Sequence, residues 1–258
     1  MNYKLLTDTA MLAGEIMLAS GAETYRVEDT MFHILKTSHS DSIEVMAILT
    51  GIMIAVNDDK LEQPISLMKQ VRRRGTNLNN VIKVNDISRR YCGGQITLEE
   101  AYESLKNVKE KQYNRTMYNV ATIGIAVSFA IVFGGNWLDA IGAAVVGGVL
   151  AAVITIGKSI KLNSILVHVI SGILIAMAAM GMERFIAPDM DSNIAIISSL
   201  MPIVPGVAIT NAVRDTLQGD YLSGGARILE AFLVAASIAV GVGLGMILFT
   251  AVLGGGLS

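Results

Sequence analysis

Five long stretches in the second half of the chain contain no Asp, Glu, Lys or Arg. A bilayer core of roughly 30 Å takes about 20 apolar helical residues to cross. Backbone polar groups inside hydrocarbon must be hydrogen-bonded within their own segment, so these stretches predict spanning helices rather than open strands. The stretches are residues 116–138, 140–157, 162–182, 192–213 and 231–258.

The predicted fold class is an α-helical membrane protein with five transmembrane helices preceded by a small α+β cytoplasmic domain. We expect the cytoplasmic α+β domain at residues 1–115 and the membrane domain at residues 116–258. The five transmembrane helices are expected at about 117–135, 138–157, 163–182, 193–213 and 229–252.

Charge is concentrated in the first part of the chain. Residues up to Arg115 hold 15 of the 20 Lys and Arg and 15 of the 22 Asp and Glu, so that part has almost no net charge. No basic excess indicates nucleic-acid binding. One cysteine, Cys92, permits no internal disulfide. His33 and His39 lack metal-ligand spacing, so we expect neither a metal nor a cofactor.

The first 115 residues show the patterns of a compact domain with helices before and after a small sheet. Apolar residues recur at helical spacing before Gly21, and a second helix is expected from about Ala22. Three β-branched runs predict a three-stranded meander. Capping boxes are expected at Ser20/Glu23 and Thr97/Glu100. The remaining predicted elements are strands at Ile43–Ala47, Ile52–Val56 and Ile65–Val71 and helices at Asn77–Tyr91 and Leu98–Lys111.

Residues 21–29, with the sequence GAETYRVED, are dense in charged and hydroxyl groups. Glu23, Arg26 and Glu28 could hold a ligand or polarise a water molecule, and we take Glu23 and Arg26 as candidates for gating or proton relay. The simpler interpretation is helix capping, with Arg26 paired to a nearby acid.

Basic residues outside the uncharged stretches gather on one side of the predicted membrane. By the positive-inside rule, this places the N-terminus in the cytoplasm and the C-terminus outside the cell inner (plasma) membrane. The opposite side offers no lysine; its charges are Asp139 in one loop and Glu183, Arg184, Asp189 and Asp191 in the next. The basic residues expected on the cytoplasmic side are Lys106, Lys109, Lys111, Arg115, Lys158, Lys161, Arg214 and Arg227.

The fourth stretch differs from the others because two prolines lie three residues apart within it. Each proline removes a helical hydrogen bond, so the helix should break near the middle of the membrane. Broken helices of this kind bind substrates in many transporters, whereas a purely structural kink is the alternative. Arg214 can hold a carboxylate through two parallel hydrogen bonds. The predicted substrate-binding residues are Pro202, Pro205, Gly206, Thr210, Asn211, Arg214 and Asp215.

Two further features concern the membrane helices. His168 is an ionisable residue within the third stretch and could relay protons, although a histidine bonded to a neighbouring carbonyl is the simpler interpretation. Small residues recur at four-residue steps, which lets helix backbones approach closely and predicts helix–helix packing. These steps are Ala143/Gly147, Ala144/Gly148 and Ser237/Gly241/Gly245.

Several blocks of sequence, taken in order, resemble the threonine/serine exporter family over nearly the whole chain. They are residues 21–29, 133–137, 202–206 and 210–215, followed by Gly219-Asp220 and Ser223-Gly224. The chain is similar to the N-terminal, larger component of the split two-gene form of that family, one pair of which is implicated in succinate export. The resemblance implies a short companion membrane subunit with its own proline break.

The sequence and the resemblance together predict an inner-membrane subunit of a secondary exporter rather than an enzyme. The resemblance implies small amino acids (threonine, serine) or dicarboxylates (succinate) as substrates, and the absence of a nucleotide-binding loop favours coupling to the proton gradient. The lipid bilayer and a small-molecule substrate are the other expected partners, with a possible homo-oligomer. The alternative is a membrane-anchored, hydrolase-like enzyme with its site near Glu23 and Arg26.

Overall fold

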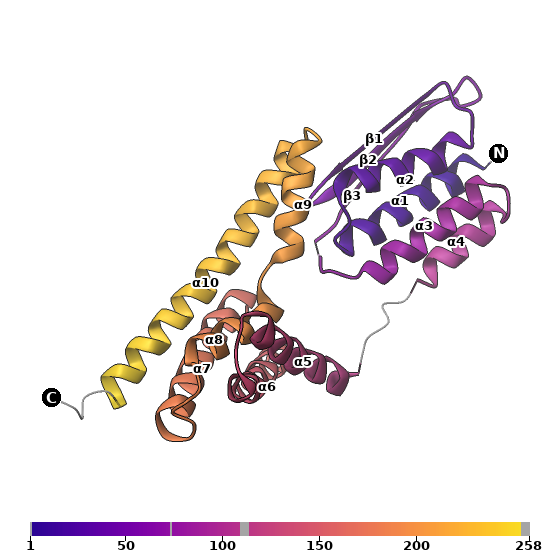
Figure 1. The fold of residues 1–258 in the computed structure, drawn as a ribbon. Coiled ribbons are helices and arrows are strands. Elements are labelled where there is room, and N and C mark those ends of the chain that lie inside the picture. The colour runs from indigo at the N-terminus through magenta and orange to yellow at the C-terminus, as the bar shows by residue number, and fades with distance from the viewer. Residues whose placement is uncertain (1, 73, 109–113, 254–258) are drawn as a thin grey trace. The chain divides into compact units, whose positions relative to one another are not determined.

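The computed structural model describes residues 2–72, 74–108 and 114–253 and is mostly helical (Figure 1). It contains two compact units. The first unit comprises residues 1–111 together with 207–229, and the second comprises residues 112–206 together with 230–258. The sequence predicts a boundary at residue 115, whereas the structure also groups residues 207–229 with the N-terminal part.

The first unit contains the predicted order of two helices, three strands and two helices. Its elements are α1 (Tyr3–Ala19), α2 (Thr24–Lys36), β1 (Ser42–Ile48), β2 (Gly51–Asn57), β3 (Ile65–Gln70), α3 (Leu78–Cys92) and α4 (Leu98–Lys106). The capping box predicted at Thr97 and Glu100 is present at the start of α4. Residues 109–111 of the last predicted helix, which include two of the predicted cytoplasmic lysines, lie outside the described residues.

The first unit is built in layers (Figure 1). The strands form an antiparallel sheet in the order β1-β2-β3, and α1 and α2 cover one face of it. Successive strand residues point to opposite faces, so Ile52, Ile54 and Val56 of β2 enter the apolar core beneath α1 and α2. The helices α3 and α4 pack on the other side of α1. The core therefore lies between the sheet and the helices.

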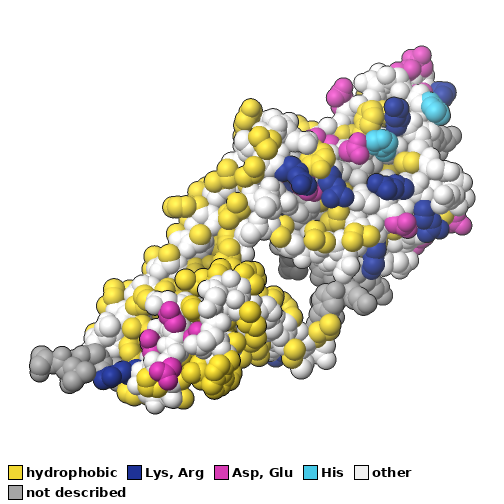
Figure 2. Space-filling model, in the orientation of Figure 1, with side chains coloured by type: hydrophobic (Ala, Val, Ile, Leu, Met, Phe, Trp, Pro, Cys, Tyr) yellow, Lys and Arg dark blue, Asp and Glu magenta, His cyan; other side chains and the backbone are white. Residues whose placement is uncertain are grey.

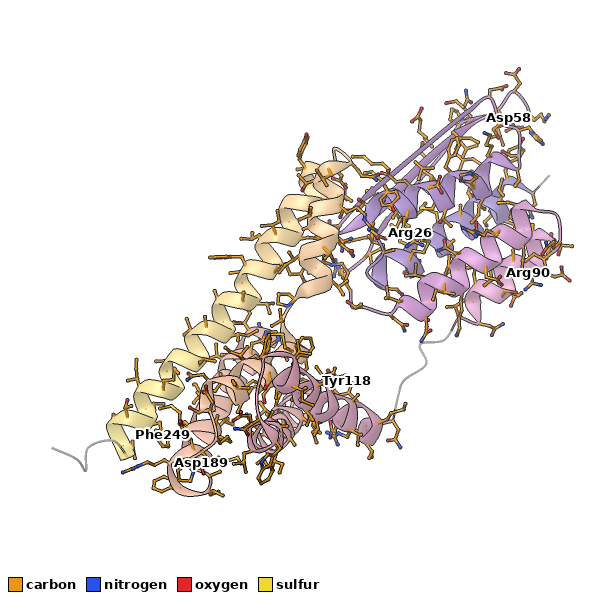
Figure 3. All side chains as sticks on the ribbon, in the orientation of Figure 1. Arg26, Asp58, Arg90, Tyr118, Asp189 and Phe249 are labelled. Atoms are coloured by element: carbon orange, nitrogen blue, oxygen red, sulfur yellow. The ribbon has the colours of Figure 1, made fainter. Side chains whose placement is uncertain are left out.

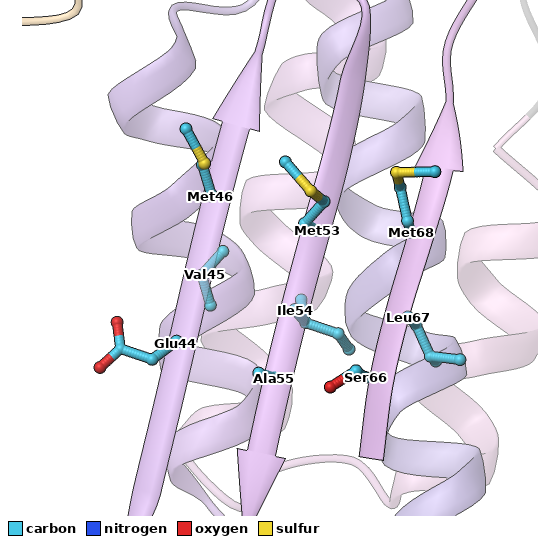
Figure 4. Close-up of a pocket in the computed structure, with 9 residues that line it drawn as sticks. All are labelled: Glu44, Val45, Met46, Met53, Ile54, Ala55, Ser66, Leu67 and Met68. Carbon is cyan, nitrogen blue, oxygen red and sulfur yellow. The ribbon is translucent and has the colours of Figure 1, made fainter. Parts of the chain in front are cut away.

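The second face of the sheet is open and almost without charge. Met46, Met53 and Met68 are cross-strand partners and form one row across it, as Figure 4 shows. Met68 is 76% exposed. A shallow hollow of about 480 Å³ lies over this face, and Glu44 is the charged residue among those that line it.

The second unit is a set of apolar helices. Its elements are α5 (Arg115–Val132), α6 (Trp137–Ser159), α7 (Ser164–Phe185), α8 (Ser192–Leu200), the 3₁₀ turn η1 (Met201–Ile203) and residues 230–253 of α10 (Tyr221–Leu253). Hydrophobic side chains cover most of its visible surface (Figure 2). Such a surface fits contact with lipid rather than water.

Four helices of the described residues are long and apolar enough to cross a membrane: α5, α6, α7 and α10. The number becomes five if α8 with η1 and α9 (Gly206–Leu217) together form one span that is interrupted after Ile203. The prediction of a multi-span helical protein with a small N-terminal sheet is confirmed, and its five spans correspond to the larger number. The last helix begins at Tyr221, earlier than the predicted start near residue 229.

Small residues allow the helices of the second unit to pack closely. A Cβ atom on Gly245 of α10 would lie 2.6 Å from the carbonyl oxygen of Ile173 in α7, and one on Gly147 of α6 would lie 2.9 Å from the Cβ of Ala126 in α5. Such contacts leave no room for a side chain. The predicted small-residue faces of α6 and α10 therefore pack on helices of the same chain.

Candidate functional site

The candidate site is built around the turn between α1 and α2, at residues 21–24. Gly21 has a φ of +81°, and a Cβ atom there would lie 2.8 Å from the carbonyl oxygen of Gly75. Glycine adopts this left-handed conformation without steric cost. The turn reverses the chain so that α2 begins at Thr24, with Glu23 as its N-cap residue.

Helix α9 and the first turns of α10 supply polar side chains to the carbonyl groups of this turn. The Asn211 side-chain amide donates to the carbonyl oxygen of Gly21 at 2.9 Å. The Arg227 guanidinium donates through Nη2 to the carbonyl oxygen of Ala22 at 2.8 Å. Both side chains are buried. Buried carbonyl groups need hydrogen-bond donors, so these two contacts tie residues 207–229 to the turn.

Asp215 of α9 lies at the N-terminus of α2 and is fully buried. Its Oδ1 accepts hydrogen bonds from the backbone N–H of Thr24 at 3.3 Å and from the Thr24 hydroxyl at 3.1 Å. A carboxylate is favoured there because the first N–H groups of a helix carry partial positive charge. Its Oδ2 lies 2.8 Å from Nε of Arg227. The two atoms form a buried ion pair without aligned hydrogen-bond geometry.

Glu23 lies between two arginines. One carboxylate oxygen accepts a hydrogen bond from Nη1 of Arg214 on α9, and the other lies 3.4 Å from Nη1 of Arg26 on α2. Burial alone would raise the pKa of Glu23, but a backbone hydrogen bond and the charges of Arg26 and Arg214 hold that pKa below its ordinary value. Glu23 is therefore a carboxylate at neutral pH.

Arg214 differs from the buried members of the site. Its side chain is 56% exposed, whereas that of Glu23 is 10% exposed. Arg26, labelled in Figure 3, is 39% exposed and lies on the first turn of α2. A guanidinium has five N–H donors in a fixed planar fork, so the exposed part of Arg214 can meet the carboxylate of a small molecule.

Glu28 and Ser223 bind the edge of the sheet beside this turn. Glu28 Oε1 accepts a hydrogen bond from the backbone N–H of Ala47 at 2.8 Å. The Ser223 hydroxyl accepts one from the N–H of Leu49 at 3.1 Å, and the N–H of Ser223 donates to Asp220 at 3.0 Å. The first contact binds the outer edge of β1, and the second places the start of α10 against the turn that follows β1.

The structure brings together six of the residues that the sequence singled out. Glu23, Arg26, Asn211, Arg214 and Asp215 form the contacts described above, and Thr210 lies one residue before Asn211, exposed, with its hydroxyl donating to the carbonyl oxygen of Val207. The other predicted residues belong to the second unit: Pro202, Pro205, Gly206 and His168. Nδ1 of His168 is buried and has no hydrogen-bond partner among the described residues.

The capping box predicted at Ser20 and Glu23 is wrong. Helix α2 starts after Glu23, and no side chain of its own caps it. The carboxylate of Glu23 is taken instead by Arg214 and Arg26, and Asp215 binds the first N–H of the helix from another element. The simpler interpretation of Arg26, that it pairs with a nearby acid, is confirmed.

Sequence reasoning missed the roles of Thr24, Asp220, Ser223 and Arg227. A signal for Arg227 was available, since it is the one basic residue between Gly219 and the end of the chain. Such a residue at the start of an apolar helix needs an acidic partner. The described residues contain no group of three or more His, Cys, Asp or Glu arranged to hold a metal ion.

Comparison with known proteins agrees with these observations. A family model described as "Putative threonine/serine exporter" matches residues 8–249. The chain is 25% identical to a "Probable threonine/serine exporter" of Mycobacterium tuberculosis over 93% of this chain and 45% of that protein. It is 26% identical to a "Threonine/serine exporter" of Corynebacterium glutamicum over 90% of this chain and 49% of that protein.

The chain thus spans about half the length of these curated relatives. No solved structure matches it. The family match covers almost all of the chain, including every residue of the site around residues 21–24. The chain therefore belongs to the threonine/serine exporter family.

Proposed function

We propose that this chain is a subunit of a secondary exporter that moves small amino acids, threonine and serine first, across the cell inner (plasma) membrane. The N-terminus lies in the cytoplasm and the C-terminus outside. The apolar helices and the family assignment support a multi-pass exporter, and the names of two relatives support the substrates. The family assignment favours transport over the alternative of a membrane-anchored enzyme.

The observation that carries this proposal is the half-exposed guanidinium of Arg214 beside the carboxylate of Glu23. An α-amino acid presents one carboxylate and one ammonium group close together. Arg214 offers planar donors to the carboxylate, and Glu23 offers an acceptor to the ammonium. The buried contacts of Asp215 and Arg227 hold both groups in place, which limits the entropy lost on binding.

Dicarboxylates such as succinate are the second candidate substrates. The observation in their favour is that Arg26 lies on the other side of Glu23, so two guanidinium groups could each take one carboxylate. Glu23 would then have to leave both arginines. The negative charge of Glu23 therefore favours amino acids over dicarboxylates.

The interruption before α9 is the second part of the proposed path. Helix α8 ends at Leu200, η1 ends at Ile203, and α9 begins at Gly206. Pro205 has no N–H to continue the helical hydrogen bonds. We propose that the substrate passes the interruption at Pro202, Pro205 and Gly206, as in transporters with discontinuous helices.

A companion membrane subunit is the proposed partner. The chain spans about half the length of its curated relatives, and transport by alternating access commonly needs two sets of helices that move around one site. The small-residue faces do not support the companion, because those of α6 and α10 already pack on α5 and α7.

Ligand binding to the full chain in lipid nanodiscs tests the proposal. Labelled threonine should bind, and unlabelled serine should displace it. Threoninamide, which lacks the carboxylate, should not compete. Arg214→Lys keeps the charge but loses the planar fork, so it should weaken binding at least tenfold, a change of about 1.4 kcal/mol.

Arg89→Lys is the matched control, because Arg89 is an exposed arginine of α3 in the same unit. Displacement by succinate but not by serine would select the dicarboxylate candidate. If the wild type and Arg214→Lys bind threonine with equal affinity, the guanidinium of Arg214 does not bind the substrate.

A further inference from the structure

The contacts around Glu28 place an ionisable group at a junction between the sheet edge and residues 207–229. β1 is an edge strand of the sheet. Glu28 of α2 binds its outer edge at Ala47, and Ser223 of α10 binds Leu49 in the turn that follows β1. Ala47 and Leu49 are two residues apart in the chain, so Glu28 and Ser223 bind neighbouring N–H groups at the end of β1.

More negative than positive charge surrounds this junction. Ser223 holds Asp220 through its backbone N–H, and the charges of Asp220 and Asp215 both act on Glu28. The buried cation on this side is Arg227, which is paired with Asp215. Arg214 and Arg26 are bound to Glu23 instead. Arg227 thus acts on Asp215 and Asp220, whereas Glu28 meets the negative charges of both aspartates.

The three carboxyl groups do not have equivalent surroundings. Asp215 has Arg227 and two donors from Thr24. Burial would raise the pKa of Asp220, but hydrogen bonds from Ser223 and the charge of Arg227 help to bring that pKa below its ordinary value. Among the described residues, Glu28 accepts one hydrogen bond, from the backbone N–H of Ala47, and has no cation as a direct partner. Burial, followed by repulsion from Asp220 and Asp215, raises the pKa of Glu28 despite the hydrogen bond from Ala47.

We propose that Glu28 is a proton-binding residue of this chain, and that its protonation strengthens the attachment of residues 207–229 to the turn at residues 21–24. A neutral Glu28 no longer repels Asp215 and Asp220 of this segment, and it keeps its acceptor oxygen for Ala47. When neighbouring carboxyl groups have different pKa values because their surroundings differ, one commonly stays ionised and another exchanges a proton. Asp220 stays ionised and Glu28 exchanges the proton.

The direction of the pH effect follows from linkage. Burial is the largest cause of the raised pKa of Glu28, and Asp220 and Asp215 of the attached segment raise that pKa further. The attached state therefore binds the proton more tightly than a state without these two charges nearby. Attachment is therefore strongest below the ordinary glutamate pKa of about 4.3. It weakens as the pH rises through the raised pKa of Glu28.

This inference deepens the proposed function, because Arg214 is carried by the segment whose attachment changes. Proton binding at Glu28 would change the position of Arg214 relative to Glu23, which is the coupling that a proton-driven exporter needs. The test measures protonation and attachment in the chain itself and uses no transported substrate. Its failure is therefore distinguishable from failure of the proposed substrate site.

Hydrogen exchange of the full chain in nanodiscs, corrected for the intrinsic pH dependence of exchange, tests the inference. In the wild type, protection of residues 207–229 should fall as the pH rises from about 4.3 towards neutral. Glu28→Gln keeps the oxygen that accepts from Ala47, so the fold should persist. That variant should lose the pH-dependent step and stay protected throughout.

Two further measurements complete the test. Glu44→Gln, on the open face of the same sheet, should behave like the wild type. The difference between the infrared spectra of the wild type and Glu28→Gln should contain a band of one protonated carboxyl group that disappears with the same pH midpoint. Protection that does not vary with pH in the wild type, a step that persists in Glu28→Gln, or a difference spectrum without that band would overturn the proposal.

Discussion

At the scale of single residues, the buried ion pair between Asp215 and Arg227 holds the site together. Both side chains are almost without solvent contact, and each also binds the turn at residues 22–24. An ion pair of this kind stabilises little relative to apolar residues, but removing one partner leaves an uncompensated buried charge. The pair therefore fixes the geometry of the site, and removing one of its two partners lowers the stability of the fold.

We expect Asp215→Asn to destabilise the chain by about 3–5 kcal/mol. The reason is that Arg227 would remain buried without a counter-charge. Thermal unfolding in detergent measures the effect. Asp86→Asn is the control, because Asp86 forms an exposed pair with Arg90 at 3.9 Å and exposed pairs contribute about 0–1 kcal/mol. Equal melting temperatures of the wild type and Asp215→Asn would contradict this role.

The sequence identified several site residues but not their partners. Glu23 and Arg26 are three apart on a helix, and such pairs are predictable from spacing. The bond between Glu23 and Arg214 joins residues 191 positions apart, and no local pattern predicts a contact at that separation. Arg214 was predicted to hold a substrate carboxylate; in the structure it holds the carboxylate of Glu23, which has the same chemistry.

At the scale of elements, the helices were predictable because hydrophobic stretches and charge set their positions. The predicted spans at 117–135, 138–157 and 163–182 each overlap a helix of the structure: α5, α6 and α7. The start of α10 was missed because Ser223 and Arg227 appear unsuited to an apolar helix. Tertiary contacts with Leu49, Ala22 and Asp215 satisfy these polar groups, which local sequence does not reveal.

Packing between α7 and α10 gives a prediction at this scale. Gly245→Ala should lower the stability of the second unit, because the added Cβ would lie 2.6 Å from the carbonyl oxygen of Ile173. Gly243→Ala on the same helix has nothing within 4 Å of the new atom. It should be neutral or stabilising by roughly 0.5–1 kcal/mol, since alanine favours helices over glycine.

Unfolding of both variants in detergent makes the comparison. The same decrease in melting temperature for Gly243→Ala and Gly245→Ala would show that the close approach of α7 and α10 does not limit the residue at position 245.

At the scale of the whole molecule, the chain belongs to the threonine/serine exporter family, and its described residues contain four to five candidate membrane spans. We expect the chain reconstituted alone in liposomes to transport little threonine, and a companion membrane subunit to restore efflux. The physical reason is that alternating access commonly requires two helix sets. Substrate-saturable efflux by the isolated chain at the full rate would show that it needs no companion.

The central claim is that Glu23 and Arg214 act as one substrate site, although they lie far apart in the sequence. A double-mutant cycle on threonine efflux from liposomes that hold the chain together with its companion subunit, measured with Glu23→Gln, Arg214→Gln and both together, tests it most directly. We expect each single variant to lose at least tenfold in initial rate, about 1.4 kcal/mol. We expect the double variant to lose no more than the worse single variant, because both residues serve the same bound substrate. Single variants with wild-type efflux, or losses that multiply in the double variant, would contradict the account.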